Sequence, residues 1–236
     1  MNPRIEWLSS LPLKYLLAAV AKKGTNTLQP KGRFEWTVYE VSHSIFPDSD
    51  ARNYYDARNI RQILTKNQIP TTGAAAELAC GYGRLVPVLT EFSDRTYGFE
   101  REPNLVEIAK RHIRDVSIIK IDDLLDVKRL APEPLDLLMI ITVLQHLTDK
   151  KNEALAKVIG ETVKPGGYLL LCESTDTSNL SVQGQPTEET AFLSKPRPLD
   201  FYKSLYSDFD LVDTSERVLE KTYDTYGGTL MLFRRR

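Results

Sequence analysis

After residue 73 the chain alternates short apolar runs with longer amphipathic stretches, and this alternation constrains its fold more than any other feature. The apolar runs occupy residues 74–79, 96–99, 117–121, 135–141 and 168–172. Between them, apolar residues recur at helical spacing over 84–92, 104–114, 124–130 and 150–163. This alternation predicts a parallel sheet with helices on both faces and the carboxyl ends of its strands along one edge. Ligands of such sheets bind at that edge.

The C-terminal part predicts that the sheet closes in a different way. Residues 174–198 form a stretch rich in Ser, Thr, Gly and Pro, which is typical of a binding loop. A helix is predicted over 199–207, and strand-like runs follow at 211–218 and 229–233. Gly227 and Gly228 separate these two runs, so we expect an antiparallel hairpin at the end of the sheet.

Residues 1–70 predict a helical appendage, which we expect to act as a lid on a domain formed by residues 71–236. One helix is predicted within residues 5–23, because apolar residues recur there at roughly helical spacing and Gly24 follows. A second helix is predicted from residue 50 to Pro70. Its expected shared face consists of Tyr54, Ala57, Ile60, Arg61 and Leu64.

The composition disfavours several classes of protein. The chain has 31 Lys and Arg against 32 Asp and Glu, and its basic cluster is confined to residues 234–236, so nucleic acid is a disfavoured partner. The apolar run 16–21 is too short to span a bilayer, and no signal-peptide cleavage pattern follows it. We therefore expect a cytoplasmic protein that does not enter a membrane. The two cysteines and three histidines lack metal-ligand spacing, so no metal site is expected.

Residues 76–84 combine a strand end, a turn of small residues and a helix start. Gly81 and Gly83 let the backbone approach a ligand closely, and the amides of the new helix face that ligand. Glu100 ends the next strand, where a carboxylate can accept hydrogen bonds from both hydroxyls of an adenosine ribose. Asp122 and Asp123 follow the third strand, where one carboxylate could meet an adenine amino group. Capping of the next helix is an equal alternative for either aspartate.

With these motifs, residues 74–175 resemble the class I S-adenosylmethionine (SAM)-dependent methyltransferases. The signature of that family is an acidic residue followed by x-Gly-x-Gly-x-Gly; Glu77, Ala79, Gly81 and Gly83 fill those positions, with Ala79 in place of the first glycine. The resemblance implies a Rossmann-like α/β fold with a mostly parallel seven-stranded sheet, and SAM as cofactor with S-adenosylhomocysteine (SAH) as product. It implies cofactor contacts at Glu77, Ala79, Gly81, Gly83, Glu100, Arg101, Asp122, Asp123, Leu124 and Thr142.

A nicotinamide dinucleotide is the rival cofactor. Its turn has the pattern Gly-x-Gly-x-x-Gly, but Val86 stands where the third glycine belongs. No separate substrate domain follows the predicted sheet either. A dehydrogenase is therefore the less favoured interpretation.

Methyl transfer from a sulfonium requires alignment of the acceptor with the methyl group, and a base helps when the acceptor is a hydroxyl. His146 follows the fourth strand at the expected ligand edge and is our candidate base, with packing or helix capping as the alternative. The candidate acceptor-binding residues are Tyr39, Arg58, Glu173, Arg197 and Tyr202. Ordinary packing is the alternative for the tyrosines, and a surface ion pair is the alternative for Arg197.

The sequence thus predicts a SAM-dependent methyltransferase, monomeric or homodimeric, that acts on a small molecule. A hydroxyl of a sugar or a secondary metabolite is the expected acceptor. Two alternatives stay open: methylation of a protein or RNA, and a non-catalytic partner protein that keeps the fold. Residues 142–145 lack the Asn/Asp-Pro-Pro-Tyr/Phe tetrapeptide of enzymes that methylate base amino groups. The intact acidic and glycine positions disfavour a loss of cofactor binding.

Overall fold

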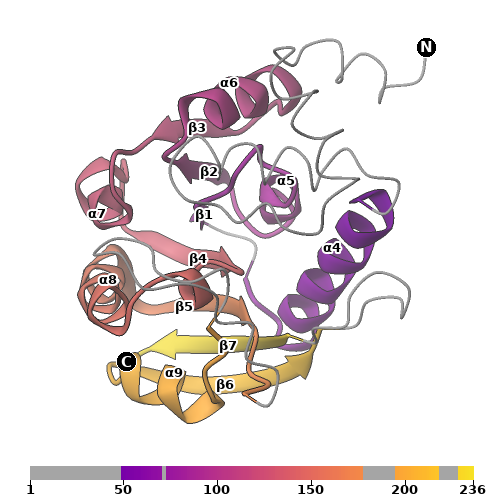
Figure 1. Ribbon diagram of the computed structural model, residues 1–236. Coiled ribbons are helices and arrows are strands. Elements are labelled where there is room, and N and C mark those ends of the chain that lie inside the picture. Colours follow the sequence, from indigo (N-terminus) through magenta and orange to yellow (C-terminus); the bar gives the residue numbers. More distant parts are fainter. Residues whose placement is uncertain (1–48, 71–72, 178–194, 218–227) are drawn as a thin grey trace, which may run out of the picture.

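A seven-stranded sheet organises the residues that the computed structural model describes, namely 49–70, 73–177, 195–217 and 228–236 (Figure 1). The strands are β1 (Ala74–Leu78), β2 (Arg95–Glu100), β3 (Ser117–Lys120), β4 (Leu135–Ile141), β5 (Val163–Glu173), β6 (Phe209–Glu216) and β7 (Thr229–Arg235). Their order is β3-β2-β1-β4-β5-β7-β6. The first five strands run parallel and β7 is antiparallel to both of its neighbours. The predicted fold class and the antiparallel closing strands are confirmed.

The strand order reverses between β1 and β4. From β1 the chain proceeds outward through β2 and β3, and it then returns to place β4 on the other side of β1. The parallel register pairs Glu77 of β1 with Met139 of β4, so the carboxyl ends of these two strands lie side by side. In open α/β sheets this reversal point is where ligands bind.

Successive side chains of each strand point to opposite faces, and helices cover both faces. On one face lie α4 (Ser49–Lys66) and α5 (Val86–Leu89), which pack on alternate residues of β1, β4, β5 and β7. Next to them, α6 (Pro103–His112) packs against β2 and β3. The opposite face carries α7 (Val127–Leu130), α8 (Asp149–Thr162) and α9 (Leu199–Leu205) (Figure 1). Two short 3₁₀ helices, η1 (Leu124–Asp126) and η2 (Leu144–His146), lie in the connections.

Helix α4 buries a stripe of side chains that overlaps the predicted face only in part. The buried residues are Asp56, Asn59, Ile60, Ile63 and Leu64, which share one helical face. Tyr54 is 63% exposed and Arg61 lies at the surface. The predicted face is therefore confirmed for Ile60 and Leu64, and Ala57 packs beside them, whereas Tyr54 and Arg61 lie outside it and two polar residues face inward. Through this stripe α4 joins the core of the sheet.

Parts of the sequence-based predictions lie outside the described residues: the first helix of the appendage, most of the loop after β5, and Gly227. Within the described ranges, no helix is both long and apolar enough to cross a membrane.

Candidate active site at the carboxyl edge of the sheet

The turn after β1 has a backbone conformation suited to close approach of a ligand. Ala79, Gly81 and Gly83 have φ angles of +58°, +60° and +82°. Glycine enters this left-handed region without strain, whereas alanine pays about 1–2 kcal/mol. Backbone hydrogen bonds fix the turn, since the Cys80 N–H donates to the Phe99 carbonyl (3.0 Å). The departure from the family glycine at Ala79 thus places a strained residue at the sheet edge, where strain is typical of functional sites.

Glu100 connects the turn after β1 to the end of β2. Its carboxylate is 6% exposed and accepts hydrogen bonds from three backbone amides. Oε2 accepts from Gly81 N–H (2.8 Å), and Oε1 accepts from Arg101 N–H and Glu102 N–H (both 2.7 Å). Amide donors favour the ionised carboxylate and fix its orientation. A buried, oriented carboxylate therefore stands where the resemblance implies a ribose contact.

Glu77 lies in β1, next to the strand that ends in Glu100. It is 4% exposed, and both carboxylates act electrostatically on the thiol of Cys80. Burial raises the pKa of the Cys80 thiol well above its ordinary value, and the charges of Glu77 and Glu100 raise it further. The thiol is therefore neutral, and the electrostatic character of this part of the edge comes from the two carboxylates.

The end of β3 supports the capping alternative for Asp123. Its side chain accepts from Leu125 N–H (2.8 Å) and forms a capping box at the start of η1. Its other oxygen accepts from Lys151 Nζ at 2.5 Å. Asp122 is exposed and pairs with Lys120, and Leu124 is half-buried against the core. The predicted adenine contact of these residues stays a prediction beside this capping role.

β4 ends in a second strained residue. Thr142 has φ +55°, and its N–H donates to the Cys172 carbonyl (2.7 Å). A positive φ is an outlier for a β-branched residue. His146 follows at the end of η2 and is half-buried. The side chain that caps α8 is Thr148, whose Oγ1 accepts from Lys151 N–H (3.2 Å), so His146 does not cap this helix.

Glu173, Arg197 and Tyr202 meet beneath the loop that follows β4, and all three are nearly or fully buried. Glu173 accepts hydrogen bonds from the backbone amides of residues 143–145, and Arg197 donates to two carbonyl groups of the same loop. Their predicted contact with an acceptor stays a prediction. The hydrogen bonds of Glu173 and two of those of Arg197 hold the protein's own backbone, and Arg197 also pairs with the Asp149 carboxylate.

Lowering the pH from about 7 to about 4.5 is expected to stabilise the native state through Glu173. Burial raises the native pKa of Glu173 to about 7 and outweighs the backbone hydrogen bonds and Arg197, which lower it. A carboxyl group with the higher pKa in the native state binds its proton on folding, so this contribution to the unfolding free energy grows as the pH falls through that window. We expect a gain of up to about 3 kcal/mol, at about 1.4 kcal/mol per pKa unit.

The comparison that isolates this effect is wild type against Glu173→Gln, by urea unfolding at pH 7 and pH 5. Other carboxyl groups, such as Glu91 and Glu133, have lowered pKa values and act in the opposite direction, but they are common to both proteins. The unfolding free energy of the wild type should rise relative to that of the variant at pH 5. A difference that is the same at both pH values would contradict the prediction.

A buried ionic cluster that sequence reasoning missed anchors the turn after β1 to α4. Asp56 of α4 is 3% exposed and binds Arg217 through both oxygens (2.7 and 2.9 Å). Arg84, the residue after Gly83, donates to the same carboxylate (2.8 Å). We call Asp56, Arg84 and Arg217 the Asp56 cluster. The only available signal in the sequence was the polar residue at an inward position of α4.

The remaining candidates occupy less central positions. Arg101 follows Glu100 and is half-exposed, with its Nε atom 3.4 Å from Glu102 Oε1. Arg58 lies on the exposed side of α4. Tyr39 falls outside the described residues. The carboxyl edge therefore brings together Glu77, the turn at residues 79–83, Glu100, Thr142 and His146.

Known proteins match both the sequence and the fold. Residues 76–171 match the family described as methyltransferase domain. Carboxy-S-adenosyl-L-methionine synthase of Erwinia tasmaniensis is 24% identical over 159 residues, which cover 63% of this chain and 64% of that protein. The chain thus spans slightly less than two thirds of the length of this curated relative.

Two solved structures show the fold. A SAM-dependent methyltransferase of the DUF858 family from Leishmania major is 20% identical with a TM-score of 0.65, and the match covers 93% of this chain and 82% of that one. Magnesium protoporphyrin IX methyltransferase from Synechocystis, with bound SAH, is 13% identical with a TM-score of 0.59 and coverage of 80% and 84%. The family match, the strand order and these neighbours agree with the motifs at the strand ends. Residues 76–171 thus match a methyltransferase domain, and the described residues have the fold of SAM-dependent methyltransferases.

Proposed function

We propose that this protein transfers a methyl group from SAM to a small-molecule acceptor, with a hydroxyl oxygen as the methylated atom. One observation carries the proposal: three features lie together where the strand order reverses. They are the left-handed turn after β1, the oriented carboxylate of Glu100, and the end of β4, which His146 follows. The Synechocystis neighbour acts, by its name, on magnesium protoporphyrin IX, which is a small molecule. The near-neutral charge of the chain adds support, because it disfavours polyanions.

The residues of this edge fit SAM. Left-handed backbone at residues 79, 81 and 83 lets the chain approach the cofactor closely, and Glu100 offers a charged acceptor for ribose hydroxyls. Glu77, Arg101, Asp122, Asp123, Leu124 and Thr142 complete the proposed cofactor contacts. When bound, SAM supplies an electrophilic methyl group. The chain's own part is to bind and orient the acceptor, exclude water, and accept the hydroxyl proton at His146.

Calorimetry with SAM and SAH tests the cofactor half of this proposal. Transfer from tritium-labelled SAM to a panel of phenols, sugars and secondary-metabolite alcohols tests the acceptor half. A histone-derived peptide and a short RNA serve as the arms for macromolecular acceptors. If only the peptide or the RNA became labelled, the acceptor would be a macromolecule and not a small molecule. If millimolar SAM gave no binding heat, the enzyme proposal would fall and a non-catalytic partner protein would take its place.

Glu100→Ala is expected to weaken SAM binding by about 1–3 kcal/mol, the range for the loss of charge-assisted hydrogen bonds. The substitution also removes the acceptor of three backbone amides, so the turn after β1 loosens at the same time. Calorimetric titration of SAM measures the change in Kd. Glu107→Ala is the matched control, because Glu107 is an exposed residue of the adjacent helix α6. An unchanged Kd in Glu100→Ala would remove Glu100 from the ribose role.

A further inference from the structure

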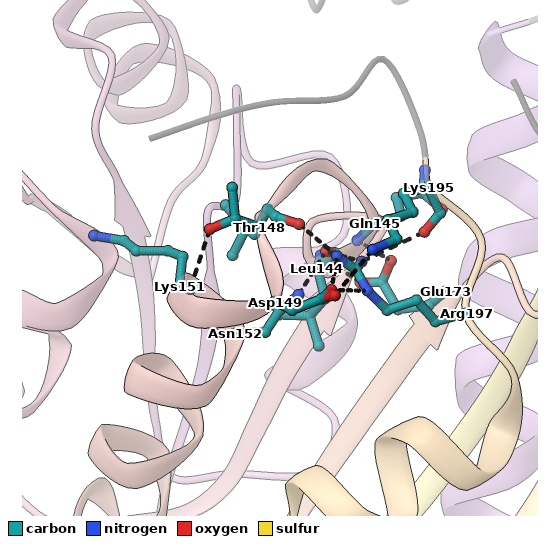
Figure 2. Close-up of polar contacts among 10 residues, drawn as sticks. Leu144, Gln145, Thr148, Asp149, Lys151, Asn152, Glu173, Lys195 and Arg197 are labelled. Atoms are coloured by element: carbon teal, nitrogen blue, oxygen red, sulfur yellow. Dashed lines mark hydrogen bonds and ion pairs between the residues drawn. The ribbon is translucent and has the colours of Figure 1, made fainter. Parts of the chain in front are cut away.

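Two buried charged groups hold the loop between β4 and α8, residues 142–148, one through its amides and the other through its carbonyls (Figure 2). We call this segment the β4–α8 loop. Glu173 Oε1 accepts from Val143 N–H and Leu144 N–H (both 2.9 Å), and Oε2 accepts from Gln145 N–H (3.1 Å). Glu173 ends β5 and is fully buried. One carboxylate thus binds three consecutive amides of a loop at the edge where a ligand is expected.

Arg197 binds the carbonyl groups of the same loop. Its Nη1 donates to Leu144 O (2.9 Å) and its Nη2 to Leu147 O (2.6 Å). Asp149, at the start of α8, accepts from Nε (2.8 Å) and orients the guanidinium, which lies 5.0 Å from the ring centroid of Phe201. The planar guanidinium can donate in several fixed directions at once, which a lysine cannot do. Amides and carbonyls of the loop are therefore bound by two different side chains.

This arrangement explains how the strained start of the loop persists. Thr142 is β-branched and has φ +55°, a conformation that is kept only where the surrounding structure enforces it. Its own N–H is bound by the Cys172 carbonyl, and the next three amides are bound by the carboxylate of the next residue of β5. The last residues of β5 thus fix the exit of β4 over four consecutive amides.

Thr142 and His146 both belong to this loop, and β4 lies beside β1, whose exit carries the proposed cofactor turn. We propose that Glu173 and Arg197 are positioning residues for methyl transfer, which hold the β4–α8 loop so that Thr142 and His146 keep their places beside the proposed cofactor turn. This inference rests on the proposed function. It assigns a role to two buried charges that the proposed cofactor contacts do not use.

Glu173→Gln tests the inference with little change in volume. The amide side chain keeps one oxygen but presents an NH₂ group to an amide that needs an acceptor, so at least one loop hydrogen bond is lost. We expect hydrogen–deuterium exchange of residues 142–147 to become about ten-fold faster or more. We also expect kcat to fall about ten-fold or more while the Kd for SAM stays within about three-fold. Thr142 is the one proposed cofactor contact within the loop, whereas Glu100 and its amides lie on the other side of β1, so most of the cofactor affinity is kept.

The same substitution at Glu161 is the matched control. Glu161 lies in the last turn of α8, is exposed, and pairs with Lys128. Glu161→Gln should therefore leave both the hydrogen–deuterium exchange of the loop and the turnover unchanged. Turnover is measured as SAH release with the fastest acceptor of the panel described above. Exchange in Glu173→Gln that matches the wild type would overturn the inference. The inference would also be overturned if kcat fell only in proportion to the fraction of folded protein, as measured by circular dichroism.

Arg197→Lys provides a second arm that separates this inference from the proposed function. If both residues act on one loop, the double variant should lose less kcat than the product of the two single losses. Losses that multiply would show independent roles and overturn the shared-loop inference. Failure of the wild type to bind SAM would overturn the proposed function, whereas normal SAM binding with unchanged loop exchange would overturn this inference alone.

Discussion

Replacing Asp56 with alanine is expected to lower the free energy of unfolding by about 3–5 kcal/mol, the range for breaking a buried ion pair by removing one partner. The Asp56 carboxylate is 3% exposed and binds two guanidinium groups, with the side chain of Arg217 4% and that of Arg84 16% exposed. Alanine leaves both positive charges in a site of low polarity without this carboxylate. The cost of burying these charges without the carboxylate exceeds that of the lost hydrogen bonds. Urea unfolding followed by circular dichroism measures the loss.

Glu91→Ala is the matched control for Asp56→Ala. Glu91 follows α5 and pairs with Arg61 of α4, so it also connects α4 to the segment after β1, but both side chains are nearly half exposed. Solvent screens such a pair, and its removal should cost less than about 1 kcal/mol. Asp56→Asn keeps the shape and one acceptor oxygen and should lie between the two. A loss below 1 kcal/mol for Asp56→Ala would show that the Asp56 cluster contributes little to stability.

The Asp56 cluster also couples stability to the site. Arg84 directly follows Gly83, so the carboxylate of Asp56 holds the end of the proposed cofactor turn against α4. Arg217 follows β6, the last strand of the sheet, and its bond to Asp56 connects this strand to α4 as well. A helix from the predicted appendage is thus fixed to the centre of the fold by charge as well as by apolar packing.

Most of the sheet could be predicted because apolar periodicity is a local property of the chain. The predicted bounds of β4 agree with those observed, and β1, β2 and β3 agree within one residue at each end. β5 is longer than predicted, Val163–Glu173 instead of 168–172, because the apolar run begins only after the turn-forming residues Lys164-Pro165-Gly166-Gly167. In the structure Gly166 has φ +78°, and Val163 already pairs with Leu135. The chain does turn at Gly166, but β5 pairs with β4 on both sides of this turn.

For the candidate site too, some residues could be located from the sequence and others could not. The turn after β1, Glu100 and Thr142 could be located because each follows a predicted strand, and parallel strands bring their carboxyl ends to one edge. The Asp56 cluster could not be located, since Asp56 and Arg217 are 161 residues apart and charged residues on a helix usually face solvent. Glu173 was among the predicted acceptor-binding residues, but no local pattern showed that its carboxylate binds three backbone amides. Pairings of distant polar groups depend on tertiary structure, which periodicity does not encode.

His146→Ala is expected to reduce kcat by about 10²-fold or more, the usual contribution of a positioned general base. His146 belongs to the β4–α8 loop, is half-buried and lies one residue after Gln145, with 3.4 Å between the two side-chain Nε2 atoms. SAH release with the fastest acceptor of the panel measures the effect at saturating SAM. His112→Ala is the control, because His112 is an exposed residue at the end of α6. A loss of only a few-fold in His146→Ala would leave His146 with a structural role.

The pH profile of kcat separates a base at His146 from the effect of Glu173 on the same loop. A histidine base makes kcat rise with pH on the acidic side of the profile, because the neutral imidazole accepts the proton. Glu173, with a pKa of about 7, binds the loop amides as a carboxylate and contributes a rise in the same window. His146→Asn should remove the first contribution and keep the second, whereas Glu173→Gln should do the reverse at a lower kcat. If the profile of Glu173→Gln were flat and that of His146→Asn unchanged, the titrating group would be Glu173, and the base role of His146 would be excluded.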